Sequence, residues 1–164
     1  MPYIETKRLK LITFTVEMME AFLKGNIEVE KIIPYKVAPE YPLDVYKQLF
    51  EYKINRFKKY PEENEWEGII IHKEDNTIMG DMGFKGGPNK DGVIDIGYSI
   101  VPSYRGKGYA TEMGKAMVEW GLSQPKVKKV VATCNPDNFA SIRVLEKIGF
   151  KITNKTEDKI YWEF

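Results

Sequence analysis

Paired cysteines are missing from this sequence of 164 residues, in which Cys134 is the only cysteine. An internal disulfide is therefore excluded, and the composition fits a reducing compartment. Long apolar runs are missing too, since none approaches the ~20 residues that a membrane-spanning helix requires. Glu5, Lys7, Arg8 and Lys10 stand where a signal peptide has its apolar core. We therefore expect a cytoplasmic protein without a membrane partner.

The sequence also has little excess charge of either sign. Lys and Arg number 25 against 24 Asp and Glu, which leaves a net charge of +1. This balance does not predict broad binding to nucleic acid or to anionic membranes. His72 is the only histidine, and we predict a surface position for it because Lys73, Glu74 and Asp75 follow it. No cluster of His, Cys, Asp and Glu has the spacing of metal ligands, so we expect no metal.

The chain reads as a single domain over residues 1–164, with no repeat, low-complexity segment or linker. The predicted order is a strand, two helices, three strands, a helix, a strand, a helix and two strands. Because the central strand-helix-strand unit requires a crossover, its two strands should be parallel, whereas hairpins at each end are antiparallel. We therefore predict an α/β (α+β) fold, with a mixed, strongly twisted sheet of about seven strands flanked by about four helices.

The first half of the chain contains two predicted helices. Val16–Lys24 has Thr15 as a plausible N-cap and Gly25 as a stop. A second helix should run to about Lys59 with Asp44 as its cap. Its apolar stripe is predicted to contain Leu43, Tyr46, Leu49, Phe50, Ile54 and Phe57.

The most informative segment is the turn Tyr104–Thr111. A strand, Val93–Val101, precedes it, and a helix, Ala110–Leu122, follows it. Backbone N–H groups at the start of a helix bind phosphates, and Gly106 and Gly108 would let a ligand approach the backbone. The turn has neither the Gly-Lys-Ser/Thr ending of a P-loop nor the third glycine of a dinucleotide fingerprint. Alone it is also compatible with a simple tight connection.

A second segment makes the pattern specific. Asn135–Phe150 follows the valine-rich strand Val127–Cys134 and includes the predicted helix Phe139–Ile148. Together the two segments resemble motifs A and B of the GNAT (GCN5-related) N-acetyltransferase superfamily. The residues that carry this resemblance are Arg105, Gly108 and Ala110 in the first segment and Asn138, Ser141, Gly149 and Phe150 in the second.

Two further segments are similar to one branch of that superfamily. Glu5–Leu11 and Gly80–Phe84 resemble the corresponding segments of the ribosomal-protein alanine and serine N-acetyltransferases. The resemblance covers nearly the whole chain and is weakest between about Lys24 and Pro61. It implies a fold in which the fourth and fifth strands diverge like a V, with acetyl-CoA in the opening. Gly97 is compatible either with a bulge at this point or with a close packing contact.

The resemblance also implies which residues bind acetyl-CoA. The pantetheine arm would lie along the backbone of Tyr98, Ser99 and Ile100. Asn138 would contact the arm or the acetyl region, although it is also a good N-cap for the helix that follows. Arg143 and Lys147 could meet the adenosine phosphates or form a solvated helix face. The pyrophosphate would lie on the turn, whose members are Arg105, Gly106, Lys107, Gly108, Tyr109, Ala110 and Thr111.

Acetyl transfer to an amine needs a base for the ammonium proton and benefits from an acid for the leaving thiolate. Many relatives use a motif B tyrosine as the acid, but Leu145 occupies that position here. Ser141, four residues earlier on the same helix face, is the predicted substitute. Asp95 is the predicted base, although a strand-surface carboxylate is an equal interpretation, and Asp81 and Glu67 are the next candidates.

The leading functional hypothesis is an N-acetyltransferase that moves the acetyl group directly to a primary amine in a ternary complex, because no Ser-His-Asp or Cys-His pattern for a covalent acyl-enzyme is present. The acceptor would be a small amine or a protein N-terminus, such as that of a ribosomal protein. The alternatives are an inactive acyl-CoA-binding module and a phosphate-binding protein unrelated to CoA. We expect the acceptor pocket between the early helices, the Pro34–Pro42 loop and the last hairpin, in a monomer or homodimer.

Overall fold

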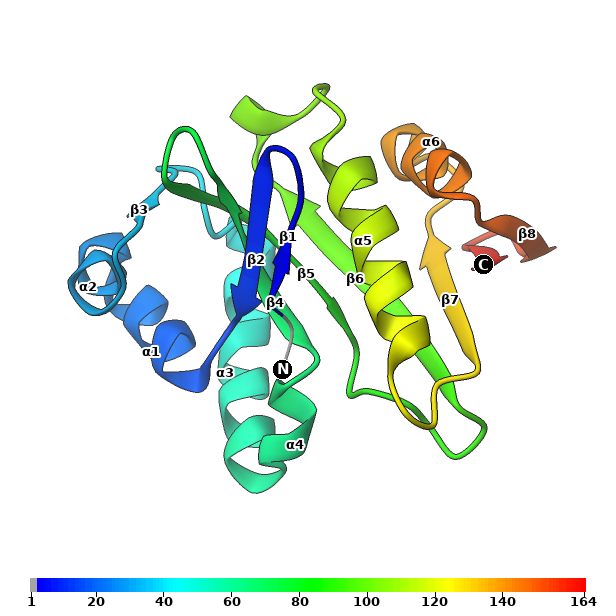
Figure 1. Ribbon diagram of the computed structural model, residues 1–164, viewed down its shortest axis with the longest axis horizontal. Coiled ribbons are helices and arrows are strands. Elements are labelled where there is room, and N and C mark those ends of the chain that lie inside the picture. Colours follow the sequence, from blue (N-terminus) through cyan, green and yellow to red (C-terminus); the bar gives the residue numbers. More distant parts are fainter. Residues whose placement is uncertain (1–2) are drawn as a thin grey trace.

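The computed structural model describes residues 3–164. Their strands form one continuous sheet, with helices on both of its faces (Figure 1). Over these residues the strands are β1 (Ile4–Glu5), β2 (Leu9–Thr13), β3 (Lys36–Val37), β4 (Glu67–His72), β5 (Thr77–Phe84), β6 (Val93–Ile100), β7 (Lys129–Cys134), β8 (Lys151–Lys155) and β9 (Ile160–Glu163). The helices are α1 (Val16–Lys24), α2 (Asn26–Ile32), α3 (Asp44–Lys59), α4 (Pro61–Asn64), the 3₁₀ helix η1 (Pro102–Tyr104), α5 (Tyr109–Ser123) and α6 (Phe139–Ile148).

The predicted mixed α/β fold is confirmed, with a few more elements than expected. The strand order is β1-β2-β4-β5-β6-β7-β9-β8, with β3 paired in parallel to β5. The two strands missed by the prediction, β1 and β3, have only two residues each. The helices missed are α2, α4 and η1, of seven, four and three residues. Such short elements carry too few residues for a periodic apolar pattern to reveal them.

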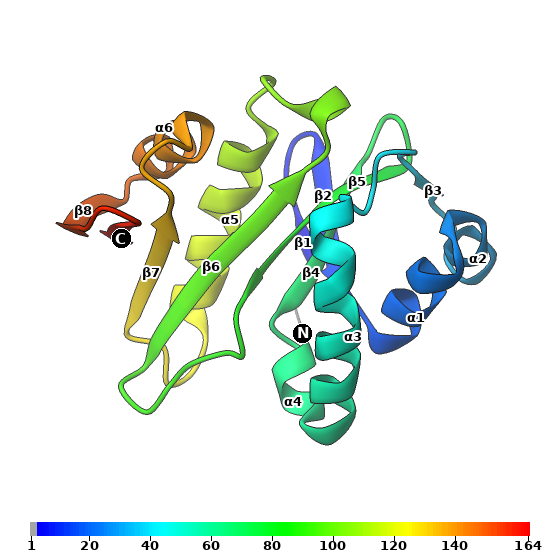
Figure 2. The ribbon, with the colours of Figure 1, turned by 180° about the vertical axis from the view of Figure 1, so that it is seen from behind.

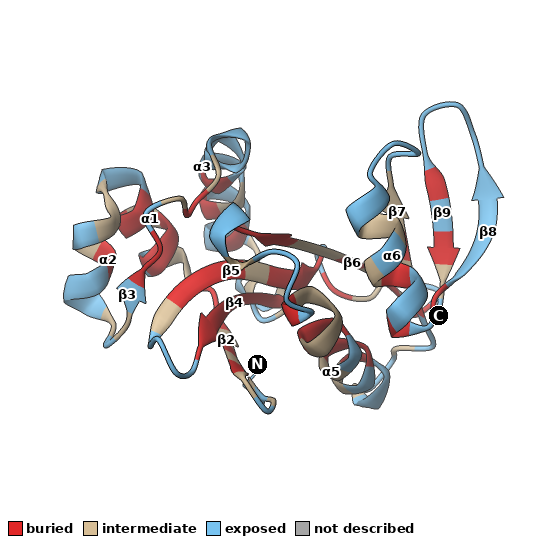
Figure 3. Ribbon diagram, turned by 90° about the horizontal axis from the view of Figure 1, so that it is seen from above, coloured by how far each residue is buried: buried red, intermediate tan, exposed pale blue. Residues whose placement is uncertain are grey.

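Helices cover the two faces of the sheet differently. α3 lies across one face with α1 packed against it, and α5 lies across the other face with α6 beside it (Figures 1 and 2). The hairpin β8–β9 forms one edge of the sheet, and its outer strand β8 is exposed along its whole length (Figure 3). The early helices and the last hairpin, which we expected to line one pocket, therefore lie toward opposite edges of the sheet.

Helix starts follow the local cap chemistry in two of three predicted cases. The Thr15 side chain accepts a hydrogen bond from the Met18 amide, and Gly25 ends α1. The Asn138 side chain caps α6 by accepting from the Ser141 amide at 3.1 Å. The prediction that Asp44 caps α3 is wrong, because the helix begins at Asp44 itself and Leu43 occupies the cap position without a side-chain bond.

The apolar stripe predicted for α3 is only half buried. Phe50, Ile54 and Phe57 are in the core, whereas Tyr46 and Leu49 are 37% and 45% exposed. The reason lies in the packing: aromatic neighbours such as Phe14 meet the helix at Phe50, with ring centroids 5.4 Å apart, so only its second half is covered.

Candidate active site

The strands β6 and β7 are paired at one end and separate at the other. Their parallel pairing covers Val93–Asp95 opposite Lys129–Val131 and ends there. β6 continues to Ile100 while paired only to β5, and β7 continues to Cys134 while paired only to β9. Figure 1 shows the two arrows diverging toward their tips. The facing edges therefore leave backbone N–H and C=O groups available to an extended ligand.

No bulge in β6 accompanies this separation. The antiparallel register between β5 and β6 is regular from Gly80↔Ile100 to Phe84↔Ile96, and it includes Gly97 opposite Gly83. An irregularity in register lies instead between β4 and β5, at Ile70/Ile71. A methyl group added to Gly97 would approach only the flexible end of the Lys85 side chain, at 3.1 Å.

The turn after β6 is built to expose backbone amides. Gly106 and Gly108 adopt positive φ angles of 75° and 82°, a conformation that costs other residues about 1–2 kcal/mol. A side-chain carbon at Gly106 would meet nothing within 4 Å, so the turn is open on that side. Glu112 makes the first bond of α5, to the Gly108 carbonyl, which leaves the earlier amides of the helix free. These features fit a bound phosphate.

Two predicted turn residues point elsewhere. The Arg105 Nε donates to the Ile100 carbonyl at 2.7 Å, so this side chain folds back onto the end of β6. The Tyr109 side chain is buried, and its hydroxyl lies 2.9 Å from Nε2 of His72. Tyr109 can therefore offer a ligand its backbone amide but not its hydroxyl. Ala110 and Thr111 are half-buried in the first turn of α5.

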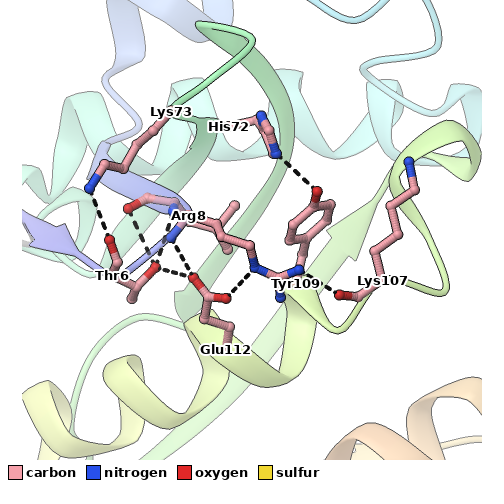
Figure 4. Close-up of polar contacts among 8 residues, drawn as sticks. Thr6, Arg8, His72, Lys73, Lys107, Tyr109 and Glu112 are labelled. Atoms are coloured by element: carbon pink, nitrogen blue, oxygen red, sulfur yellow. Dashed lines mark hydrogen bonds and ion pairs between the residues drawn. The ribbon is translucent and has the colours of Figure 1, made fainter.

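The surface position predicted for His72 is wrong. Its side chain is buried, with 7% of the residue exposed, between Tyr104 and Tyr109. The Asp75 amide donates to Nδ1 at 3.2 Å. The other ring nitrogen, Nε2, faces the Tyr109 hydroxyl (Figure 4). The charged residues that follow His72 belong to the exposed turn between β4 and β5, whereas His72 itself still pairs with β2.

The residues of β6 divide between the two faces of the sheet. Ile94 faces α5, because a side chain added to Gly121 of that helix would meet it. Since neighbouring strand residues alternate, Tyr98 shares this face, while Asp95 and Ser99 lie on the face that α3 covers. The predicted base and the predicted acid, Ser141 of α6, therefore lie on opposite sides of β6.

Tyr98 is the only residue besides Asp95 within residues 3–164 to have a buried side-chain oxygen without a hydrogen-bond partner. Burial raises the pKa of the Tyr98 phenol, and the nearby Ser141 hydroxyl partly offsets this rise without reaching regular hydrogen-bond geometry. A buried polar group without a partner costs about 1–3 kcal/mol. Sequence reasoning assigned Tyr98 through its backbone alone and missed this hydroxyl.

We expect Tyr98→Phe to leave the unfolding free energy of the ligand-free protein unchanged or raised, because it removes a hydroxyl that has no partner. The matched change Tyr109→Phe should lower it by about 1–2 kcal/mol, since it breaks the bond to His72. Urea unfolding of both variants measures the difference. A loss of 1 kcal/mol or more in Tyr98→Phe would show that the hydroxyl is already satisfied.

Asp95 lies at the point where β6 and β7 separate, as the last residue of their pairing. Its Oδ2 is 3.5 Å from the Lys85 Nζ, and its Oδ1 is buried without a donor. The side chain is 36% exposed, so solvent still reaches the carboxylate. It can therefore accept a further hydrogen bond or a proton.

The other two candidate carboxylates form a buried network on the same face. Tyr41 donates to Asp81 at 2.6 Å, and Lys53 of α3 lies 3.1 Å from Glu67. Burial raises the pKa of Asp81, although bonds from Tyr41 and Ser99 and the charge of Lys53 oppose the rise. Burial likewise raises the pKa of Glu67 against the effect of Lys53. Asp81 stands opposite Ser99 in the sheet, and Ser99 lies four residues along β6 from Asp95.

The second motif contributes a helix face to the opening. Ser141 is half-buried, and Leu145 is buried, so no hydroxyl is present at the position of the usual tyrosine. Arg143 and Lys147 are exposed on the outer face of α6. Asn138 uses its Oδ1 for the helix cap, which leaves its amide N–H groups for another partner. Cys134 ends β7 and accepts from the Trp162 indole at 3.3 Å.

Residues 3–164 lack both a candidate metal site and a candidate membrane span. That part of the chain has no group of three or more His, Cys, Asp or Glu side chains placed to hold a metal ion. None of its helices is both long and apolar enough to cross a membrane.

Known proteins are similar to this chain in sequence. A family model described as an acetyltransferase (GNAT) domain matches residues 8–151. A Bacillus subtilis protein named as an uncharacterized N-acetyltransferase, YjdG, is 32% identical over 168 residues, covering 99% of this chain and 97% of its own. A second one from B. subtilis, YnaD, is 28% identical over 91% of this chain and 82% of its own.

Solved structures share the fold. A Bacillus anthracis GNAT acetyltransferase superposes with a TM-score of 0.67 at 23% identity, covering 99% of this chain and 98% of its own. A ribosomal L7/L12 alpha-N-protein acetyltransferase, solved with CoA joined to a cysteine by a disulfide, gives 0.70 at 15% identity over 99% and 97%. The family match and the full-length relative agree with the diverging strands and the glycine turn. The chain belongs to the GNAT family and is an acetyl-CoA-dependent N-acetyltransferase.

Proposed function

We propose that this enzyme transfers the acetyl group directly to a primary amine, in a ternary complex with acetyl-CoA, and that a protein N-terminus is the first acceptor class to test. The observation that carries the proposal is the opening between β6 and β7, which has the glycine turn at one end and Asp95 at the other. Acetyl-CoA supplies an activated acetyl thioester. The chain supplies the binding site for the cofactor, a carboxylate and hydroxyl groups.

Direct transfer is supported by the surroundings of the potential nucleophiles. Cys134 is bonded to Trp162, and His72 to Tyr109 and Asp75, so the only cysteine and the only histidine do not form a reactive pair. A covalent acyl-enzyme needs a nucleophile with an adjacent base. The same single cysteine supports our proposal of a cytoplasmic location.

We assign the cofactor to the backbone of Tyr98, Ser99 and Ile100 and to the amides from Gly106 to Thr111. The thiol end would lie near Ser141 and Cys134, which both adjoin the Tyr98 phenol. The CoA–cysteine disulfide in the ribosomal L7/L12 alpha-N-protein acetyltransferase supports a thiol close to a cysteine. Ser141 would then donate a hydrogen bond to the departing sulfur, in place of the hydroxyl that Leu145 lacks.

Ser141→Ala should slow the chemical step by ~10²-fold or more, the usual scale for general acid catalysis. The affinity for CoA should change far less, because one neutral hydrogen bond contributes about 0.5–1.5 kcal/mol. The fold should survive, since the helix cap uses the Ser141 amide rather than its hydroxyl. Single-turnover rates measure the step, with Ser123→Ala at the end of α5 as the control. Normal rates in Ser141→Ala would show that the thiolate leaves unaided or through water.

On the amine side, we assign proton removal to Asp95, whose Oδ1 has no donor. Asp81 and Glu67 stay as the competing candidates, and they make the α3 face suited to a cationic amine. A cavity of about 580 Å³ lies between the end of α1 and the segment Pro39–Asp44, with Lys47 beside it. It is large enough for the first side chains of a peptide.

The experiment is amine-dependent release of CoA from acetyl-CoA, followed with a thiol reagent. The acceptors are peptides beginning with alanine or serine, the same peptides with blocked N-termini, polyamines and free amino acids. We expect release with the free peptides and none with the blocked ones. Release with small amines alone would overturn the peptide acceptor, whereas CoA binding without release for any amine would favour the binding module that Leu145 permits.

A further inference from the structure

Arg8 on the N-terminal segment is fixed by a carboxylate of the helix that follows the glycine turn. Its Nε donates to Glu112 at 2.7 Å, and its backbone amide donates to the same carboxylate at 3.0 Å (Figure 4). Thr6 adds a third bond to Glu112, at 2.6 Å. Burial alone would raise the pKa of Glu112, but these bonds outweigh it and hold the pKa below its usual value. The carboxylate is therefore charged, and the guanidinium is locked in place.

The rest of the Arg8 side chain reaches the turn itself. Nη1 donates to the Lys107 carbonyl at 2.9 Å, which ties the residue between the two glycines to the N-terminal segment. The guanidinium carbon lies 4.4 Å from the centre of the Tyr109 ring. Nη2 has no bonded partner within residues 3–164, and it would lie 3.5 Å from a side-chain carbon added to Gly108. A free, charged N–H donor therefore adjoins the turn.

The Tyr109 side chain is also held through its hydroxyl. Its hydroxyl bonds to His72 (Figure 4), and the Nδ1 of His72 accepts from the Asp75 amide. Tyr104, just before the turn, donates to the Asp75 carboxylate at 2.8 Å. The turn is thus connected to β4 and to the N-terminal segment, which are both remote from it in sequence. Arg8 therefore adds a positive charge beside a turn that contains Lys107, while the Arg105 Nε is bonded to the Ile100 carbonyl.

We propose that Arg8 is a positioning residue for the diphosphate of acetyl-CoA. It holds the Lys107–Gly108 amides in their binding orientation through the Lys107 carbonyl and adds a fixed positive charge beside them. This inference rests on the proposed placement of the cofactor at the turn. Sequence alone does not reveal this role of Arg8, because its partners lie about 100 residues away in the chain.

The experiment compares Arg8→Gln and Arg8→Lys with a matched control, Arg56→Gln. Arg56 also pairs with a carboxylate, that of Glu63, and also covers a tyrosine ring, that of Tyr60, but on α3. Calorimetric titration gives the Kd for CoA. Steady-state rates give kcat and KM for acetyl-CoA and for S-acetylpantetheine, which has the thioester and the arm but no diphosphate. Thermal melting reports on the fold.

We expect Arg8→Gln to raise the Kd for CoA and the KM for acetyl-CoA about tenfold or more, with kcat nearly unchanged. The kcat/KM for S-acetylpantetheine should stay within twofold of the parent value. Arg8→Lys should recover part of the affinity, because it keeps the charge but not the paired bonds. Arg56→Gln should change neither affinity.

Equal losses with both acyl donors, or no loss with either, would overturn the inference for Arg8. If Arg8→Gln does not fold, the same comparison in Arg8→Lys decides the question. Failure of the proposed cofactor placement looks different, since Gly108→Val, which distorts the turn itself, would then also leave the Kd for CoA unchanged.

Discussion

Gly108→Val is expected to raise the Kd for CoA at least about 100-fold. Gly108 has a φ of 82°, in which a β-branched residue is a genuine outlier, so valine should rotate the peptide units on both sides. Hydrogen bonds to charged groups contribute about 1.5–3 kcal/mol each, and misdirecting two of them accounts for the loss. Crowding contributes little in the free protein, because the added carbon meets only Arg8, at 3.5 Å. Calorimetric titration with CoA measures the effect.

The control for this prediction is Gly86→Val. Gly86 has a φ of 74° and open space around it, as Gly106 does, but it lies in the turn between β5 and β6. Both variants should lose similar stability, since both suffer the same backbone strain, and only Gly108→Val should lose CoA affinity. Unchanged affinity for CoA in a folded Gly108→Val protein would show that the diphosphate does not bind at the turn.

Asp95→Asn is expected to lower kcat by ~10²–10⁴-fold, the range that general acid–base catalysis provides. The amide keeps the size of the side chain but cannot take the ammonium proton. The acidic limb of the kcat/KM profile should disappear with the carboxylate, while the Kd for CoA stays the same. The matched control, Asp91→Asn, changes an exposed carboxylate in the loop before β6 and should leave the rates unaltered.

Asp81→Asn separates the two candidate bases. Burial raises the pKa of Asp81, so a reaction that depends on its ionised form would lose activity as the pH falls through a value above the usual aspartate range. If the acidic limb lies there and vanishes in Asp81→Asn but persists in Asp95→Asn, Asp81 is the base. Wild-type rates in both variants would leave Glu67 or a water chain as the remaining candidates for the base.

Local signals predicted the elements of the second motif well. The range of α6, Phe139–Ile148, agrees with its prediction because Asn138 and Gly149 fix both ends within a few residues. The strand β4, Glu67–His72, is bounded in a similar way, by the turn that contains Glu74–Asn76. A helix or strand whose limits are set by adjacent side chains can be predicted without knowledge of the rest of the chain.

Contacts between distant segments could not be predicted in the same way. His72 was assigned to the surface from the charges after it, yet it is buried by Tyr104 and Tyr109, more than 30 residues later. The position of the Arg8 side chain depends on its bond to Glu112. The surroundings of the Tyr98 hydroxyl depend on the approach of α6. The candidate base Asp95 was found from its neighbours on the strand, but its unpaired oxygen depends on how β6 and β7 separate.

The crystal structure of the protein with bound CoA tests the central claim most directly. The account predicts diphosphate oxygens within about 2.7–3.2 Å of the amides from Gly106 to Thr111, the usual range for such hydrogen bonds. The pantetheine arm should lie between β6 and β7, and the thiol should lie beside Ser141 and the Tyr98 hydroxyl. A diphosphate bound elsewhere, such as at Lys126, Lys128 and Lys129, or an arm outside the two strands, would contradict the account.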